Sequence, residues 1–142
     1  MSFEEFITRK IRLDEELYKV EEKIAALRAQ AEKSTTSLTL APGGNAYNDS
    51  RLEELVIKIA DLEAEEQELL KEMEGVSAEL SSFLSDLSDP YQMSVLIERY
   101  VNLKTMEQIM EILNRSRSFV KVKHRSGFAE AEKLYENRKK EI

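Results

Sequence analysis

Apolar residues recur at intervals of alternately three and four positions along the first part of the chain. This spacing places side chains on one stripe of a helix, so the series predicts an amphipathic helix. Ser2 and Glu5 have the spacing of a capping box and predict where that helix starts. The series consists of Phe3, Phe6, Lys10, Leu13, Leu17, Val20, Ile24, Leu27 and Ala31, with Lys10 as its one polar member.

A second series with the same spacing runs from residue 52 to residue 87. Ser50 and Glu53 again form a candidate capping box at its start. Its members are Leu52, Leu55, Ile59, Leu62, Glu66, Leu69, Met73, Val76, Leu80, Phe83 and Leu87, of which only Glu66 is polar. Because the pattern is sustained over five heptads, it is typical of a coiled coil.

Residues 34–50 separate the two series and contain Pro42 followed by two adjacent glycines. This composition predicts a flexible, poorly ordered loop. Two helices joined by such a loop would close as a long antiparallel coiled-coil hairpin, which we assign to residues 1–88. In that pairing Phe3 lies near Leu80, and the segment 83–87 is expected to pack on the carboxyl-terminal part.

Each helix of the hairpin has a further apolar line beside its main series. The two lines consist of Ile7, Ile11, Tyr18 and Ala25 on the first helix and Val56, Leu70 and Leu84 on the second. Three apolar positions in seven suit a four-helix bundle better than a lone pair, which predicts a homodimer. The alternative is that these side chains contact the carboxyl-terminal domain or lie exposed.

Residues 89–142 are expected to form a second domain built from three helices. Asp89 with Pro90 and Thr105 with Gln108 predict two helix starts. Asn114 tolerates the left-handed conformation of a tight turn, and Ser116 can cap the helix that follows. A short capped helix, a tight turn and a longer helix form a helix-turn-helix, whose second helix enters the DNA major groove.

The two parts differ in charge. Residues 1–90 hold ten Lys and Arg against 21 Asp and Glu, a formal charge of −11, whereas residues 91–142 hold 11 against seven, a charge of +4. No acidic residue occurs from Ile112 to Ala129. Val120, Gly127, Ala131 and Leu134 would share the inward face of the last helix. We therefore predict contacts with double-stranded DNA by Thr105, Arg115, Arg117, Ser118, Lys121, Val122 and Arg125.

Composition narrows the function further. The chain has no cysteine, so disulfides and thiolate metal sites are excluded, and no apolar run reaches the roughly 18 residues of a membrane span. His124, the single histidine, is expected to pack or to meet solvent, and the glutamates at 63, 65, 66 and 68 to be solvated. We expect no enzyme activity, catalytic residue, metal site, cofactor or small-molecule substrate, no membrane association, and a cytoplasmic location in a bacterial cell.

The stretch from Arg99 to Phe128 resembles region 4 of bacterial sigma factors. The matching residues are Arg99, Tyr100, Thr105, Glu107, Ile109, Leu113, Ser116 and Val120. Three positions depart from that pattern: Met110 replaces a small alanine, Asn114 replaces a glycine, and Lys123 replaces an inward Ile or Leu whose space Phe119 can fill. With the preceding hairpin, the chain is similar to small phage and prophage regulators of Gram-positive bacteria of the ArpU and RinA type.

This resemblance implies an all-α protein that regulates late-gene transcription, with a sigma region 4-like helix-turn-helix that binds DNA. The hairpin would dimerise or contact RNA polymerase. Two alternatives stay open: an interaction adaptor that does not bind DNA, and a DNA-packaging protein like the small terminase subunit.

Overall fold

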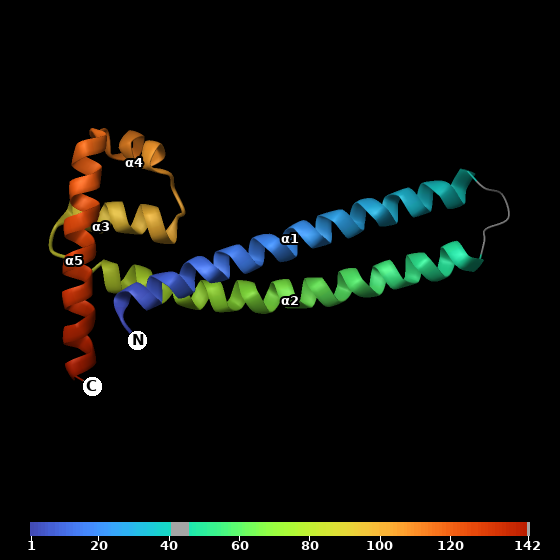
Figure 1. The fold of residues 1–142 in the computed structure, drawn as a ribbon, viewed down its shortest axis with the longest axis horizontal. Helices are drawn as coiled ribbons and strands as arrows, with labels where there is room; N and C mark the ends of the chain where they lie inside the picture. Colours follow the sequence, from blue (N-terminus) through green and yellow to red (C-terminus); the bar gives the residue numbers. More distant parts are fainter. Residues whose placement is uncertain (41–45, 142) are drawn as a thin grey trace. The chain divides into compact units, whose positions relative to one another are not determined.

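The chain is all-α, as predicted. The computed structural model describes residues 1–40 and 46–141, with the side chains of residues 1–33 and 50–140, and this part of the chain contains no strand. Its elements are α1 (Phe3–Leu40), α2 (Ala46–Leu84), α3 (Pro90–Leu96), the π-helix η1 (Ile97–Val101), α4 (Met106–Leu113) and α5 (Arg117–Glu141) (Figure 1). Among the described helices, none has the length and apolar character needed to cross a membrane.

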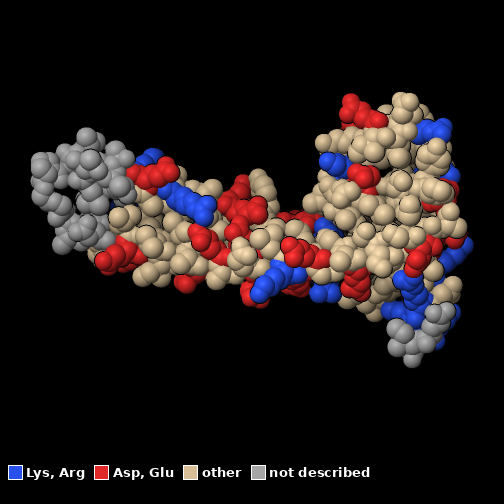
Figure 2. Space-filling model, turned by 180° about the vertical axis from the view of Figure 1, so that it is seen from behind, with Lys and Arg blue, Asp and Glu red and all other residues tan. Residues whose placement is uncertain are grey.

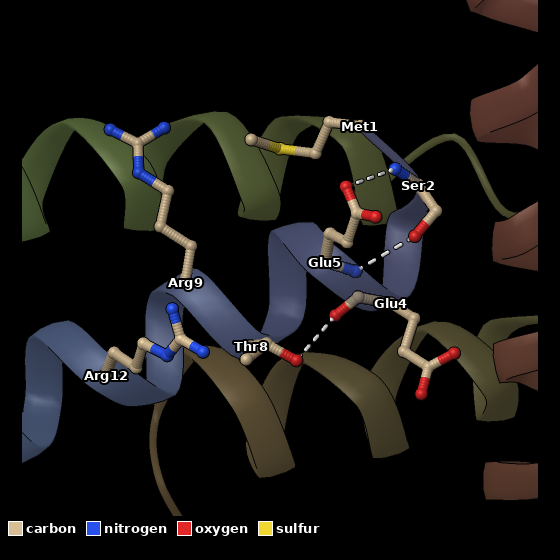
Figure 3. A pocket seen from close by; sticks show the side chains of 7 residues that line it. All are labelled: Met1, Ser2, Glu4, Glu5, Thr8, Arg9 and Arg12. Carbon is tan, nitrogen blue, oxygen red and sulfur yellow. Dashed lines mark hydrogen bonds between the residues drawn. The ribbon is translucent and has the colours of Figure 1, made fainter.

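The predicted capping box at the start of α1 is confirmed. The hydroxyl of Ser2 accepts a hydrogen bond from the Glu5 amide at 3.1 Å, and the Ser2 amide donates to the Glu5 carboxylate at 3.3 Å. Figure 3 shows both bonds beside a surface hollow of about 600 Å³ lined by residues of the first turns of α1. Beside the cap, the Thr8 hydroxyl donates to the Glu4 carbonyl within α1 at 2.9 Å.

The two long helices extend further than predicted. The predicted loop spans residues 34–50, but α1 continues to Leu40 and α2 already begins at Ala46. The reason is that residues 34–40 include neither glycine nor proline, so nothing in them breaks a helix before Pro42. The remaining loop residues 41–45, on which the prediction of poor order falls, lie outside the described residues.

The chain divides into two compact units. Unit 1 comprises Met1–Arg12 and Met73–Ile142, and unit 2 comprises Leu13–Glu72. These units do not coincide with the predicted boundary between residues 88 and 89, because the first turns of α1 and the last turns of α2 group with the shorter helices. Both α1 and α2 therefore contribute to both units.

In unit 2 the segments of α1 and α2 lie side by side and run in opposite directions (Figure 1). Their buried side chains are Leu13, Leu17, Val20, Ile24 and Leu55, all members of the two predicted series. At the surface, Arg28 of α1 and Glu63 of α2 form an ion pair at 2.7 Å. The apolar series thus predicted which side chains this unit buries.

Aromatic rings form much of the core of unit 1. The Phe3 ring lies 5.6 Å from the Phe83 ring and 5.0 Å from the Phe128 ring, and Phe83 lies 5.7 Å from Tyr135. The predicted packing of the end of α2 on the carboxyl-terminal part is therefore confirmed for Phe83. Lys10, the polar member of the first series, is also buried in this unit.

Two residues of the predicted flanking apolar lines, Ile7 and Leu84, lie in unit 1 and are buried. Their burial within the single chain agrees with the alternative of contacts inside the chain and not with a face that a second copy covers. Ile11, Tyr18 and Val56 are exposed.

The helices α3, α4 and α5 pack around a second cluster in unit 1. Val95, Ile109 and Val120, one from each helix, are almost completely buried. Met106, Met110 and Leu113 are partly buried against them. This cluster fixes which face of α5 points inward.

Candidate nucleic-acid interface

The start of α4 has the predicted capping box. The hydroxyl of Thr105 accepts a hydrogen bond from the Gln108 amide at 3.2 Å, and the Thr105 amide donates to the Gln108 side chain at 2.9 Å. Thr105 was predicted to present amides to a phosphate. Its own amide is already used by Gln108, so of the groups of Thr105 the exposed hydroxyl, whose oxygen accepts in the capping box, is the one that keeps a hydrogen to donate to a phosphate.

The turn between α4 and α5 is also as predicted. Asn114 has φ 53° and ψ 50°, in the left-handed region. The Asn114 amide donates to the Glu111 carbonyl at 3.2 Å and the Arg115 amide to the Met110 carbonyl at 3.1 Å, which together form a Schellman motif. The Ser116 hydroxyl then accepts from the Phe119 amide at 3.2 Å and caps α5.

Four predicted contact residues share the exposed side of α5. Ser118, Lys121, Val122 and Arg125 are all exposed, and we call these four residues the outward face. No ion pair joins Lys121 or Arg125 to any residue that the structure describes. Figure 2 shows Lys and Arg side chains at the edge of the molecule that α5 forms. The outward face therefore combines two unpaired cations, a hydroxyl and an exposed valine.

Arg115 lies apart from this face. Its guanidinium donates a hydrogen bond to the Tyr91 hydroxyl at 2.7 Å and lies 5.0 Å from the centre of the Tyr91 ring. It also lies 4.8 Å from the centre of the Phe119 ring, which packs edge-on against Tyr91. Contacts of this kind stabilise an arginine through its planar charge. Arg115 therefore connects the turn before α5 to the start of α3. Its side chain is exposed and a guanidinium has five donor hydrogens, so donors other than the one bonded to Tyr91 can still contact a phosphate.

Arg117 is engaged by an acidic residue of α4. Its guanidinium lies 2.6 Å from the Glu107 carboxylate, and both side chains are more than half exposed. The Glu107 backbone amide, and after it Arg117, lower the pKa of this carboxyl, so the pair is charged at neutral pH. An exposed pair of this kind contributes little to stability, and solvent or another anion can replace one partner.

Lys123 points inward and not toward the outward face. Its Nζ lies 2.7 Å from the carboxylate of Asp89, and both side chains are about three-quarters buried. The Asp89 carboxylate also accepts the Tyr91 and Gln92 amides and so caps α3, as predicted. The bond from Lys123, and then those two amides, lower the pKa of Asp89 against the opposing effect of burial. Phe119 is half-buried, and the centre of its ring lies 5.7 Å from Nζ of Lys123. That Phe119 fills the space of an inward Ile or Leu stays a prediction.

His124 packs, as predicted, and its partner is Tyr100. Its Nε2 lies 2.7 Å from the Tyr100 hydroxyl. Burial, and to a lesser extent the charge of Arg99, lower the pKa of His124 below its ordinary value of 6.5. No group of three metal-ligating side chains occurs among the residues that the structure describes.

Sequence reasoning missed two features beside this pair. The helix predicted across residues 95–100 changes to a π-helix at Ile97, and a small cavity lies between η1, α4 and α5. Neither has a sequence signal, since a five-residue turn leaves no distinct apolar spacing.

Comparison with protein families, curated proteins and solved structures finds no match for the chain.

Proposed function

We propose that the chain is a phage- or prophage-type transcriptional regulator that binds double-stranded DNA through a helix-turn-helix formed by α4 and α5. The observation that carries the proposal is the outward face of α5, with its two unpaired cations. The capped start of α4 and the Schellman turn support it, because they hold α5 rigidly behind the exposed side chains.

The outward face has the chemistry that a major groove requires. Lys121 and Arg125 can contact phosphates or guanine edges, and Ser118 can donate to or accept from either. Val122 is 62% exposed, although burial would be the favourable state of an isolated apolar side chain. Its methyl groups suit the methyl group of a thymine. In this proposal Lys121 and Arg125 provide most of the affinity, while Val122 contributes to sequence selectivity.

Three of the predicted contact residues already have partners within the chain and take secondary roles in this proposal. Arg117 can transfer from Glu107 to a DNA phosphate, since an exposed ion pair is easily exchanged. Thr105 and Arg115 position α4 and α5. The helices α1 and α2 would form an antiparallel coiled coil that dimerises the protein, with RNA polymerase as a second candidate partner. The sequence contains no stretch resembling the promoter-melting part of a sigma factor, so in this proposal the protein does not open DNA on its own.

The alternative that a specific observation favours is an interaction adaptor. Of the five basic residues Arg115, Arg117, Lys121, Lys123 and Arg125, three are engaged by Tyr91, Glu107 and Asp89. Two unpaired cations are few for a DNA-binding helix. In the adaptor, the outward face would contact a protein surface instead of a duplex.

A salt titration of DNA binding tests the proposal. Fluorescence anisotropy would measure the affinity of the full chain for labelled duplexes that tile the genome encoding it. The logarithm of the affinity should fall with the logarithm of the salt concentration, with a slope of about −0.9 for each phosphate contact. Lys121→Ala and Arg125→Ala should each make the slope less steep by about one.

Lys133→Ala is the matched control, because Lys133 lies later on α5, is exposed and pairs with Glu130. It should leave the slope unchanged. If no duplex binds at low salt, or if the control lowers the slope as much as Lys121→Ala does, the DNA-binding proposal fails. Absence of binding would favour the adaptor.

A further inference from the structure

Glu107 and Arg117 meet across the turn between α4 and α5. Glu107 lies in the first turn of α4, and Arg117 is the first residue of α5. The Thr105 capping box and the left-handed turn at Asn114 fix the two backbones, and the Glu107 carboxylate lies 2.6 Å from the Arg117 guanidinium. Because the amino-terminal end of a helix favours a negative charge, the start of α4 and the guanidinium both stabilise the carboxylate.

The pair remains accessible to a further anion. The side chains of Arg117 and Glu107 are 53% and 67% exposed, whereas those of Lys123 and Asp89 are 25% and 28% exposed. An exposed ion pair is held weakly, so either partner is readily exchanged. Arg117 directly precedes Ser118 of the outward face. A duplex that contacts Ser118 therefore brings phosphates close to this pair.

The Glu107 carboxylate occupies donors of Arg117 that a phosphate would use. A phosphate oxygen accepts hydrogen bonds from a guanidinium in the same way as a carboxylate oxygen, so the two anions compete for the same donor hydrogens. After an exchange, Glu107 still lies near the phosphates, and its negative charge is repelled by theirs. Both effects weaken the binding of a polyanion at the start of α5.

We propose that Glu107 competes with DNA phosphates for Arg117 and thereby lowers the affinity of the chain for every duplex. This role of Glu107 rests on the proposed function, because it requires that the outward face meets DNA. Since phosphate contacts carry no sequence information, the loss of affinity is the same for all duplexes. Glu107 therefore limits non-specific binding, and the base contacts of the outward face account for a larger share of the affinity that remains.

Glu107→Gln tests the competition, because glutamine keeps the size of the side chain and removes its charge. At low salt, the affinity of the full chain for the labelled duplexes should rise about threefold or more, as expected for the loss of an exposed ion pair and of the repulsion. The rise should be equal for the most tightly and the least tightly bound duplex. A rise confined to one duplex would contradict the proposal, since it would mean that Glu107 contacts a base.

A double-mutant cycle separates competition for Arg117 from simple repulsion. In a chain that carries Arg117→Ala, the change Glu107→Gln removes the repulsion alone, so its effect on the affinity should be smaller by about threefold. Glu111→Gln is the matched control, because Glu111 is an exposed acidic residue of α4 that has no ion pair with a described residue. The effect of Glu111→Gln on the affinity should be the same with Arg117 and with Arg117→Ala.

Equal effects of Glu107→Gln with Arg117 and with Arg117→Ala, in chains that bind duplexes, would show that Glu107 does not compete for Arg117. The role of Glu107 would then be wrong, while DNA binding would stand. If neither the unchanged chain nor Glu107→Gln binds any duplex at low salt, DNA binding and the role of Glu107 are both wrong. Binding by Glu107→Gln alone would support both.

Discussion

Lys123 connects α5 to the start of α3 through an ion pair whose two side chains are about three-quarters buried. Its Nζ lies 2.7 Å from the Asp89 carboxylate and 5.7 Å from the centre of the Phe119 ring, so the inward lysine still satisfies its charge. Apolar periodicity alone predicts that a lysine lies on the solvent-exposed face of a helix. The inward direction of Lys123 could therefore not be predicted from periodicity, although the position itself was recognised as one that usually holds Ile or Leu.

For three residues predicted to contact DNA, sequence spacing likewise does not predict the side-chain partners. The cap pattern correctly predicts that Thr105 starts α4. Sequence spacing cannot show that Arg115 lies on Tyr91 or that Arg117 pairs with Glu107, because those partners are 24 and ten residues away and meet only through the turn at Asn114. Sequence spacing predicts the face of a helix, whereas a pairing across helices depends on three-dimensional geometry.

His124 predicts a pH dependence of stability. Because its pKa is lowered in the folded chain, the unfolded chain takes up a proton first as the pH falls. The contribution of the neutral, buried His124 to the free energy of unfolding is therefore fully present above pH 6.5. It is lost as the pH falls from 6.5 through the lower pKa of His124 in the folded chain. The ordinary pKa values of Asp89 and Glu107 are 3.8 and 4.5, so protonation of these two carboxyls lowers the free energy of unfolding only at more acidic pH.

Urea unfolding at several pH values between 7.5 and 5 measures this effect. The midpoint of the unchanged chain should decrease over this interval, and the decrease should be smaller in His124→Gln, which cannot titrate. Parallel curves for the two proteins would show that His124 does not contribute to the pH dependence.

At the scale of elements, α3 and α5 approach each other closely at Gly127. A Cβ atom at this position would lie 3.0 Å from Cβ and 3.4 Å from Cα of Gln92, and 3.3 Å from the side chain of Leu96. Two of these neighbours belong to or adjoin the backbone of α3 and cannot move aside cheaply. Gly127 thus sets the distance between the two helices, in agreement with its predicted inward position.

Gly75 and Gly127 form a matched pair of helical glycines within unit 1. Nothing lies within 4 Å of a Cβ at Gly75, so Gly75→Ala should stabilise the protein by about 0.5–1 kcal/mol through helix propensity alone. Gly127→Ala gains the same propensity but forces α3 and α5 apart, and overpacking typically costs about 1–3 kcal/mol. Thermal unfolding should therefore show a higher midpoint for Gly75→Ala and a lower one for Gly127→Ala.

A higher midpoint for both variants would mean that α3 can shift away from α5 without loss. That result would remove the argument that Gly127 fixes the spacing of the two helices.

Most of the predicted helix boundaries are confirmed, but the start predicted at Ser50 is wrong, because α2 already begins at Ala46 and Ser50 lies within the helix. Ser2, Asp89, Thr105 and Asn114 act through bonds to backbone groups no more than a few residues away, so their local sequence suffices. The ends of α1 and α2 were less predictable. Residues 34–40 are serines, threonines and two leucines, which neither favour nor forbid a helix strongly, so the proline and the glycines beyond them decide the predicted loop boundary.

At the scale of the whole molecule, charge is divided along the chain. Residues 1–90 carry −11 and residues 91–142 carry +4. A polyanion would be repelled by the first part and attracted by the second, so a DNA contact is expected only in the second. The helix-turn-helix assignment and this division of charge lead to the same part of the chain by independent arguments.

The exposed apolar residues of unit 2 carry the prediction of a homodimer. Tyr18, Val56 and Ile57 are each more than half exposed. Sedimentation equilibrium should give twice the chain mass of 16.4 kDa. Val56→Glu should weaken the dimer by about tenfold or more, because it places a charge in an apolar contact.

Lys58→Glu serves as the control, since Lys58 is an exposed polar neighbour on α2. It should leave the mass unchanged. A mass of 16.4 kDa for the unchanged chain at all concentrations would contradict the dimer.

The ring of Phe3 lies among those of Phe83, Phe128 and Tyr135, so unit 1 joins the first turn of the chain to a helix that the ribosome makes more than a hundred residues later. During synthesis Phe3 can pack on Phe83 as soon as α2 is made, but the contacts of Phe3 with Phe128 and of Phe6 with Tyr135 cannot form until α5 has left the exit tunnel. Unit 2, which is made of residues 13–72, can form before that. The nascent protein is therefore expected to complete its hairpin segment first and its aromatic core last.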